Sequence, residues 1–105
     1  SVTREDVLEG ALTGAGGVYH ACVHNYLHER SEAVLDELCK SAFFTMRAVH
    51  FLGTGKALRT REELKSECSA DSDIIDAKLS GSFEEQSRRL LGWSSEMVKT
   101  LGQMR

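Results

Sequence analysis

Histidine recurs at every fourth position in the stretch GVYHACVHNYLHER, as His20, His24 and His28. On an α-helix, side chains four residues apart lie on one face, so the three imidazoles would form a stripe. Two histidines at this spacing can serve as zinc ligands, although a closed site needs more ligands. The nearest carboxylates, Glu9 and Glu29, are not well placed to supply them. We interpret the stripe as a solvent or contact face, with a metal site on the three histidines as the alternative.

A second group of candidate residues is basic and lies where a predicted helix ends in a glycine-containing loop. Arg47 and His50 are three positions apart, so their side chains can share one surface patch. Together with the backbone amides of the loop, this patch predicts a contact with a phosphate or nucleotide. The alternative is a solvated loop after a helix end that favours cations. The predicted phosphate-binding residues are Arg47, His50, Lys56, Arg59 and Arg61.

The loop itself, GTGKALR, is not a P-loop. The pattern G-x-x-x-x-G-K requires glycine where this sequence has His50, and Lys56 is followed by Ala57 instead of serine or threonine. Nucleophilic catalysis has little support either. Cys22 and Cys39 fall on apolar helix faces, where thiols usually pack without reacting.

Length and composition limit the class of protein. The chain has 105 residues, which predicts a single domain over residues 1–105. Its formal net charge of −3 argues against a surface dedicated to DNA or RNA. Three cysteines without a CxxC pair predict reduced thiols and a cytoplasmic location. No apolar run is long enough to cross a membrane. The absence of proline and of sustained strand-type alternation predicts an all-α protein.

A long amphipathic helix must position the histidines. It is predicted over residues 4–28, with Thr3 as its N-cap and Asp6 completing a weak capping box. Its apolar residues recur at steps of three, four and one, which predicts one continuous buried stripe. That stripe consists of Val7, Leu8, Ala11, Leu12, Ala15, Val18, Tyr19, Cys22, Val23, Tyr26 and Leu27.

Further helices are predicted from their start and stop signals. A second long helix starts near Ser31 and ends before the glycines of the GTGKALR loop. Capping boxes at 60–63 and 82–85 open a short helix and a last long helix, and another short helix is expected in the segment 69–82. The fold predicted is an up-and-down bundle of three long and one or two short helices.

Three glycines on one edge of the first predicted helix need an explanation, because each glycine inside a helix costs about 1 kcal/mol relative to alanine. Either the helix breaks near Gly14–Gly17, or another backbone approaches this edge closely. The second interpretation predicts a homodimer. Its predicted interface consists of Gly10, Gly14, Gly17, Ala21, His24 and His28.

The run EAVLDELCKSAFFTMRAVHFLGTGKALRTREELKSE, residues 32–67, resembles the helical domains of the HEPN (higher eukaryotes and prokaryotes nucleotide-binding) type. Such bundles commonly accompany a minimal nucleotidyltransferase, as a separate chain or as its C-terminal domain. The resemblance implies a dimer-forming bundle with a basic groove between helices, lined by the five predicted phosphate-binding residues. In the nuclease branch of that family, an arginine and a histidine with four to six residues between them cleave RNA, usually across a homodimer. Here only two residues separate Arg47 from His50, which departs from the motif.

The function predicted from the sequence is therefore an accessory or binding module, dimeric and HEPN-like, which associates with a nucleotidyltransferase or a nucleotide ligand. We expect no cofactor, no DNA and no membrane partner, and binding without catalysis. Two alternatives stay open. One is an RNA-cleaving toxin that uses Arg47 and His50, and the other is a metal-binding bundle that uses His20, His24 and His28. A helical assembly domain without a ligand is a further possibility.

Overall fold

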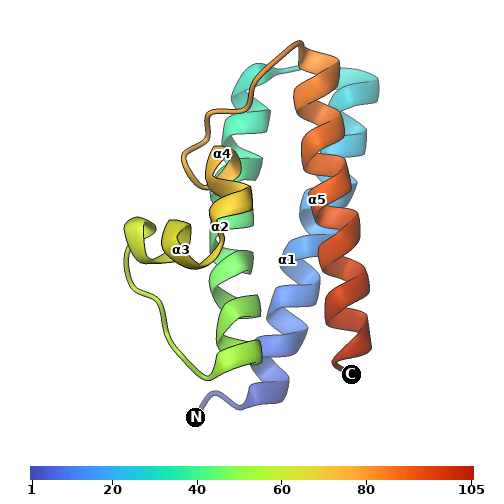
Figure 1. Cartoon of the computed structure of the whole chain (residues 1–105). Helices are drawn as coiled ribbons and strands as arrows, with labels where there is room; N and C mark the ends of the chain where they lie inside the picture. The colour runs from blue at the N-terminus through green and yellow to red at the C-terminus, as the bar shows by residue number, and fades with distance from the viewer.

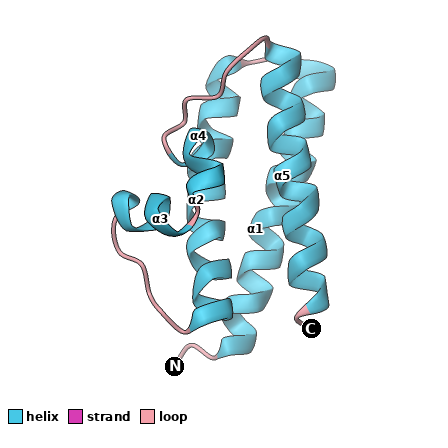
Figure 2. Ribbon diagram, in the orientation of Figure 1, coloured by secondary structure: helices cyan, strands magenta, loops and turns pink.

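The structure, a computed structural model, describes all 105 residues and contains helices and no strands (Figure 2). The α-helices are α1 (Arg4–His24), α2 (Glu32–Thr54), α3 (Arg61–Glu67), α4 (Ser72–Ile75) and α5 (Phe83–Gln103). A π-helical turn, Asn25–Glu29, extends α1, and a 3-10 turn, Ser69–Asp71, precedes α4. The prediction of an all-α fold is confirmed, whereas the predicted up-and-down order is not, because the long helices α2 and α5 run in the same direction (Figure 1).

The three long helices lie side by side, and the two short ones pack beside α2 (Figure 1). α2 runs antiparallel to α1. The connection through α3 and α4 then returns the chain to the end where α2 begins, so that α5 runs antiparallel to α1 and in the same direction as α2 (Figure 1). Both termini therefore lie at one end of the molecule, where the Arg105 guanidinium contacts the Glu9 carboxylate at 3.0 Å.

The predicted helix starts are confirmed as local hydrogen-bonded caps. Reciprocal capping boxes open α1 at Thr3, α3 at Thr60 and α5 at Ser82. The Ser31 hydroxyl accepts a hydrogen bond from the first turn of α2. α2 ends at Gly55, whose φ of 77° is the left-handed conformation that glycine adopts at little cost.

α1 is continuous through its glycines, so the predicted alternative of a break near Gly14–Gly17 is wrong. The close approach at Gly14 comes from within the chain. A Cβ atom built on Gly14 would lie 2.6 Å from the Thr45 hydroxyl oxygen on α2. Glycine at this position therefore lets α1 and α2 pack closely against each other.

A buried asparagine fixes the turn between α1 and α2. The side-chain amide of Asn25 donates to the Ser31 carbonyl at 3.1 Å, and the Ser31 backbone N–H donates to the Asn25 amide oxygen at 3.0 Å. Arg30, between them, has the left-handed conformation, with φ of 51°. This exchange of hydrogen bonds gives the turn a defined geometry although it contains no glycine or proline.

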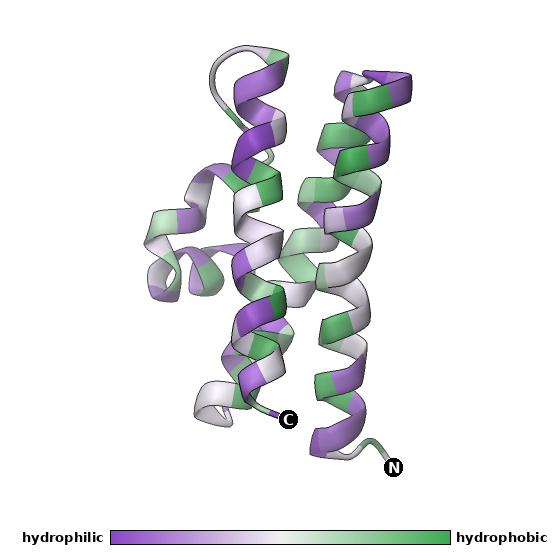
Figure 3. Cartoon of the chain, turned by 90° about the vertical axis from the view of Figure 1, so that its right-hand side faces the viewer, coloured by the Kyte–Doolittle hydropathy of each residue, from purple (hydrophilic) through white to green (hydrophobic).

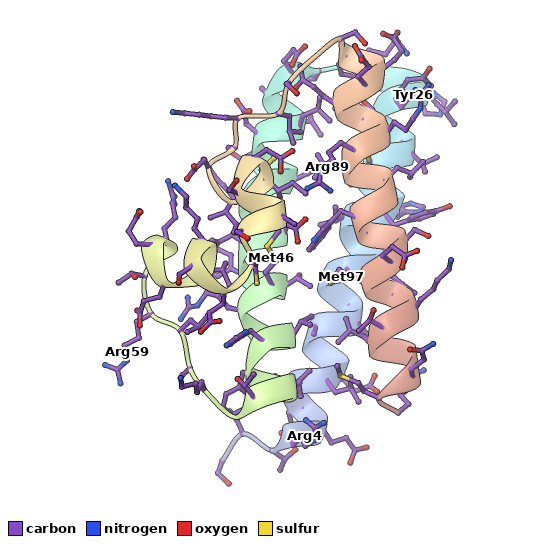
Figure 4. The ribbon with its side chains drawn as sticks, in the orientation of Figure 1. Arg4, Tyr26, Met46, Arg59, Arg89 and Met97 are labelled. Atoms are coloured by element: carbon purple, nitrogen blue, oxygen red, sulfur yellow. The ribbon has the colours of Figure 1, made fainter.

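The core lies between the long helices and under α4, in two buried clusters. Hydrophobic and hydrophilic stretches alternate along the long helices, as amphipathic packing requires (Figure 3). The predicted stripe of α1 is too wide at one margin: Tyr19, Tyr26 and Leu27 are exposed, Leu27 by 63%. α2 and α5 make the main contacts with α1 and leave the outer part of the stripe partly uncovered. Tyr26 lies at the end of the bundle (Figure 4), where its ring stacks on that of Phe83 at 6.2 Å between centroids.

An ion cluster holds α4 and the 3-10 turn before it against α5. The guanidinium of Arg89 contacts the carboxylates of Asp71 and Asp73 at 2.9 and 3.0 Å, and it donates to the Ala70 carbonyl (Figure 4). One arginine with two carboxylates in hydrogen-bond geometry is the kind of network that contributes more than an isolated surface pair. It ties the segment that carries α4 to the last long helix.

Candidate functional site

The three predicted histidines lie on the exposed face of α1 and its π turn. The rings of His24 and His28 are 4.8 Å apart, and the His24 Nδ1 atom lies 3.4 Å from the Glu29 carboxylate. No group of three or more His, Cys, Asp or Glu side chains is arranged to hold a metal ion. The structure therefore does not support the alternative of a metal site on His20, His24 and His28.

The six residues of the predicted dimer interface divide into two sets. Gly14 and Ala21 contribute to packing within the chain, against Thr45 and the larger core cluster respectively. The exposed set consists of Gly10, Gly17, His24 and His28. A Cβ built on Gly10 or Gly17 would meet nothing within 4 Å, so this edge is free in the single chain.

Arg47, the first predicted phosphate ligand, binds within the chain. Its Nε atom donates to the Leu58 carbonyl at 2.9 Å, and its guanidinium carbon lies 5.8 Å from the centre of the Phe43 ring. Arg47 thereby holds the loop after α2 against that helix. The remaining N–H groups of its guanidinium make no hydrogen bond within the chain, so they can still contact a ligand.

The other predicted ligands do not gather around Arg47. His50 is partly buried, and its Nε2 atom has no hydrogen-bond partner. Lys56 borders a hollow together with Glu62, Glu63 and Glu67, which gives that hollow an acidic surrounding. Arg59 extends away from the bundle into solvent (Figure 4). The basic groove implied by the family resemblance is therefore not assembled from all five predicted residues.

Arg61 lies instead beside an exposed aromatic side chain on α2. The Phe44 side chain is 63% exposed, and its ring meets that of Phe43 edge to face at 5.5 Å between centroids. A hollow of about 410 Å³ next to it is lined by Lys40, Phe43, Phe44 and Arg61, together with residues of α4 and the turn after it. Two cations and two aromatic rings thus share one concave surface.

A second hollow, of about 240 Å³, borders the other side of Phe44. Arg47 and Phe51 line it with apolar residues of α1, α2 and the loop that Arg47 holds. We call the combined region the α2 aromatic surface; it consists of Lys40, Phe43, Phe44, Arg47, Phe51 and Arg61. Sequence reasoning missed Phe44, although one signal was present. Two adjacent residues on a helix point about 100° apart, so Phe43 and Phe44 cannot both face the core.

The charge of the α2 aromatic surface is positive near Arg61. Asp76 lines the same hollow, but the Lys65 ammonium lies 2.9 Å from its carboxylate. The hydrogen bond from Lys65 lowers the pKa of Asp76, and the same contact raises the pKa of Lys65. Asp76 is therefore compensated by Lys65. Lys40 has a weak exposed pair with Glu37 at 3.3 Å, which a ligand can displace.

Cys22 and Cys39 are buried, as predicted, and neither offers a nucleophile. All three are free thiols. Burial raises the pKa of Cys22, and burial with the nearby Asp36 and Asp73 carboxylates raises the pKa of Cys39 to about 11. Because the thiolate is the reactive form, both side chains are protonated and unreactive at neutral pH.

None of the helices combines the length and the apolar composition needed to cross a membrane. Comparison of the chain with protein-family models, with curated proteins and with solved structures gave no match.

Proposed function

We propose that this chain is a helical binding module whose α2 aromatic surface binds a nucleotide-bearing ligand. The observation that carries the proposal is the Phe44 ring, exposed on a helix and flanked by the cations Lys40, Arg47 and Arg61. The resemblance of residues 32–67 to HEPN-type domains supports the same class of ligand. It also makes a nucleotidyltransferase the partner that we propose for the module.

The chemistry of the surface suits a nucleotide in two respects. A base can stack on an exposed aromatic face, which contributes about 1–3 kcal/mol per base. Arginine and lysine side chains bind phosphate oxygens, and arginine does so through a planar fork of N–H donors. Two of the predicted phosphate ligands, Arg47 and Arg61, lie on this surface, and Lys40 adds a third cation.

Calorimetric titration with ATP and with inorganic triphosphate tests the proposal. We expect ATP to bind more tightly, because only ATP offers a base to Phe44. Phe44→Ala should weaken ATP binding by about tenfold, which corresponds to the lower part of the stacking range. Tyr19→Ala is the matched control, since Tyr19 is a partly exposed aromatic residue on α1. Equal affinities of Phe44→Ala and the wild type would contradict the proposal.

We also propose that the module self-associates through the exposed edge of α1. Gly10 and Gly17 support this proposal. Each lowers the helix propensity of α1, although no group of the chain lies in the space beside it that would require a glycine. Sedimentation velocity over a range of concentrations tests this part. Gly17→Leu should shift a dimer to monomer, whereas a chain that is monomeric at all concentrations would remove the edge from the proposal.

RNA cleavage is not part of the proposal. One N–H of the Arg47 guanidinium is used by the Leu58 carbonyl, and the spacing of Arg47 and His50 departs from the nuclease motif. No observation places a reacting phosphate between these two side chains.

A further inference from the structure

A third hollow, separate from the α2 aromatic surface, lies between α1 and α5. It has a volume of about 320 Å³, at the lower end of the range of about 300–1,000 Å³ that is usual for small-molecule sites. All of its lining comes from the last turns of α1, the π turn and the first half of α5. The lining residues are Cys22, Val23, Tyr26, Leu27, Glu84, Ser87, Arg88 and Leu91. We call it the α1–α5 groove.

The walls of the α1–α5 groove are apolar and partly open to water. Val23 and Leu91 are half-buried, whereas Leu27 is an exposed apolar side chain that no other element covers. Removing such surface from water is favourable in proportion to its area. The walls therefore favour an occupant with an apolar body.

The lining of the groove includes a buried serine whose hydrogen bonding is incomplete. Ser87 is 4% exposed, and its hydroxyl has no hydrogen-bond partner. The Cys22 thiol donates to the Ser87 carbonyl at 3.3 Å and leaves the hydroxyl free. Ser94, two turns later on α5, bonds to the Leu90 carbonyl at 2.9 Å, as helical serines commonly do. A buried hydroxyl without a partner is costly, but the Ser87 oxygen is covered by the chain itself, so it offers no polar contact to an occupant of the groove.

The charges at the rim leave one cation without a partner. The Glu84 carboxylate is bound by Arg30 at 2.6 Å. The guanidinium of Arg30 also lies 4.9 Å from the ring centres of Tyr26 and Phe83, which fixes its position. Arg88 is exposed and makes no ion pair and no side-chain hydrogen bond. Besides backbone hydrogen bonds, the charge of Arg88 helps to lower the pKa of Glu84 and of Glu85. Neither carboxylate forms an ion pair with Arg88, however, so the N–H groups of its guanidinium stay free for a ligand.

We propose that the α1–α5 groove binds a small amphipathic carboxylate. Its hydrocarbon body lies on Val23, Leu27 and Leu91, and its carboxylate accepts hydrogen bonds from Arg88. Guanidinium and carboxylate form charge-assisted pairs in this arrangement, often through two parallel hydrogen bonds. A second copy of the chain is a poorer occupant, because a twofold contact centred on the groove brings two Arg88 side chains together.

The test uses decanoate below its critical micelle concentration, added to the ¹⁵N-labelled full chain and followed by amide chemical shifts. We expect saturable shifts at Val23, Leu27 and Leu91, and no saturable shifts with decyltrimethylammonium, which carries the opposite charge. Shifts that do not saturate, or equal binding of the cationic probe, would overturn the proposal. Decanoate must not shift the amides of the α2 aromatic surface. Binding in the groove can then be judged independently of whether the α2 aromatic surface binds ATP.

Two variants locate the carboxylate and the hydrocarbon chain of decanoate, and a third is the control. Arg88→Gln should weaken decanoate binding by roughly three- to fivefold, as expected for an exposed ion pair. Arg59→Gln removes an exposed arginine elsewhere and should leave the affinity unchanged. Leu27→Glu replaces an exposed wall residue by a carboxylate and should weaken binding by about tenfold through lost apolar contact and repulsion. Unchanged affinity in Arg88→Gln, or dimerisation that blocks the shifts, would show that the groove has a different occupant.

Discussion

The two flanks of α1 carry similar residue types but have different surroundings. On the flank towards α2, Gly14 lies against Thr45, and Asn25 is buried with two hydrogen bonds to Ser31. On the adjacent outer flank, about 60° further around the helix, Gly17 has open space beside it, and His24 is exposed. Small and polar residues therefore have a packing role on one flank and no neighbour on the other. The same substitution should have opposite consequences on the two flanks.

The largest difference is expected at Asn25. Asn25→Ala removes both hydrogen bonds that hold the turn at Ser31, and it leaves partly buried backbone groups without partners. We expect the free energy of unfolding to fall by about 2–3 kcal/mol, measured by urea denaturation. Asn25→Asp retains an acceptor for the Ser31 N–H and should lose less than Asn25→Ala. Equal losses in the two variants would contradict the hydrogen-bonding explanation.

The next largest effect is expected at Gly14. Gly14→Ala places a methyl group 2.6 Å from the Thr45 hydroxyl oxygen, so α1 and α2 must separate or Thr45 must change its rotamer. Overpacking of this kind costs about 1–3 kcal/mol. A double-mutant cycle with Thr45→Ala is the control. The cost should largely disappear in the double mutant, and a cost that persists there would assign another role to Gly14.

The helix caps and the glycines of α1 show which features of the fold the sequence can predict and which it cannot. The capping boxes at Thr3, Thr60 and Ser82 were predictable, because each involves residues three positions apart. The difference between Gly14 and Gly17 was not, because it depends on where α2 packs. The positions of the glycines in the sequence of α1 do not tell whether the helix that packs against them belongs to the same chain or to a second copy.

The candidate site was predictable to a smaller extent, for a similar reason. The predicted cations are local to one segment, but the loop after α2 folds back through the hydrogen bond from Arg47 to Leu58. Lys56 therefore borders a hollow with three glutamates, whereas Arg61 borders the hollow beside Phe44. The exposure of Phe44 depends on the absence of any element over that part of α2. The path of the loop has no signature in residue spacing, and the adjacency of Phe43 and Phe44 shows only that one of the two rings must lie outside the core.

A smaller effect of opposite sign is expected at Gly17. Its Cβ position is open, so Gly17→Ala should gain helix propensity without a clash and stabilise the single chain by about 1 kcal/mol. Thermal unfolding at low protein concentration measures this effect. The unfolding of the same variant is then measured at high protein concentration, where a dimer would form. Stabilisation that is lost as concentration rises would indicate that a second chain needs this glycine.

The smallest effect is expected at His24, on the same outer flank. Its ring lies near His28, and its pair with Glu29 at 3.4 Å is exposed on both sides. Exposed pairs of this kind contribute little, and substitutions away from packed positions usually change stability by less than about 0.5 kcal/mol. We expect His24→Ala to fall within that range in urea denaturation at low protein concentration. A loss as large as that of Gly14→Ala would mean that the outer flank of α1 is packed against a partner, and self-association would then explain the histidines as well as the glycines.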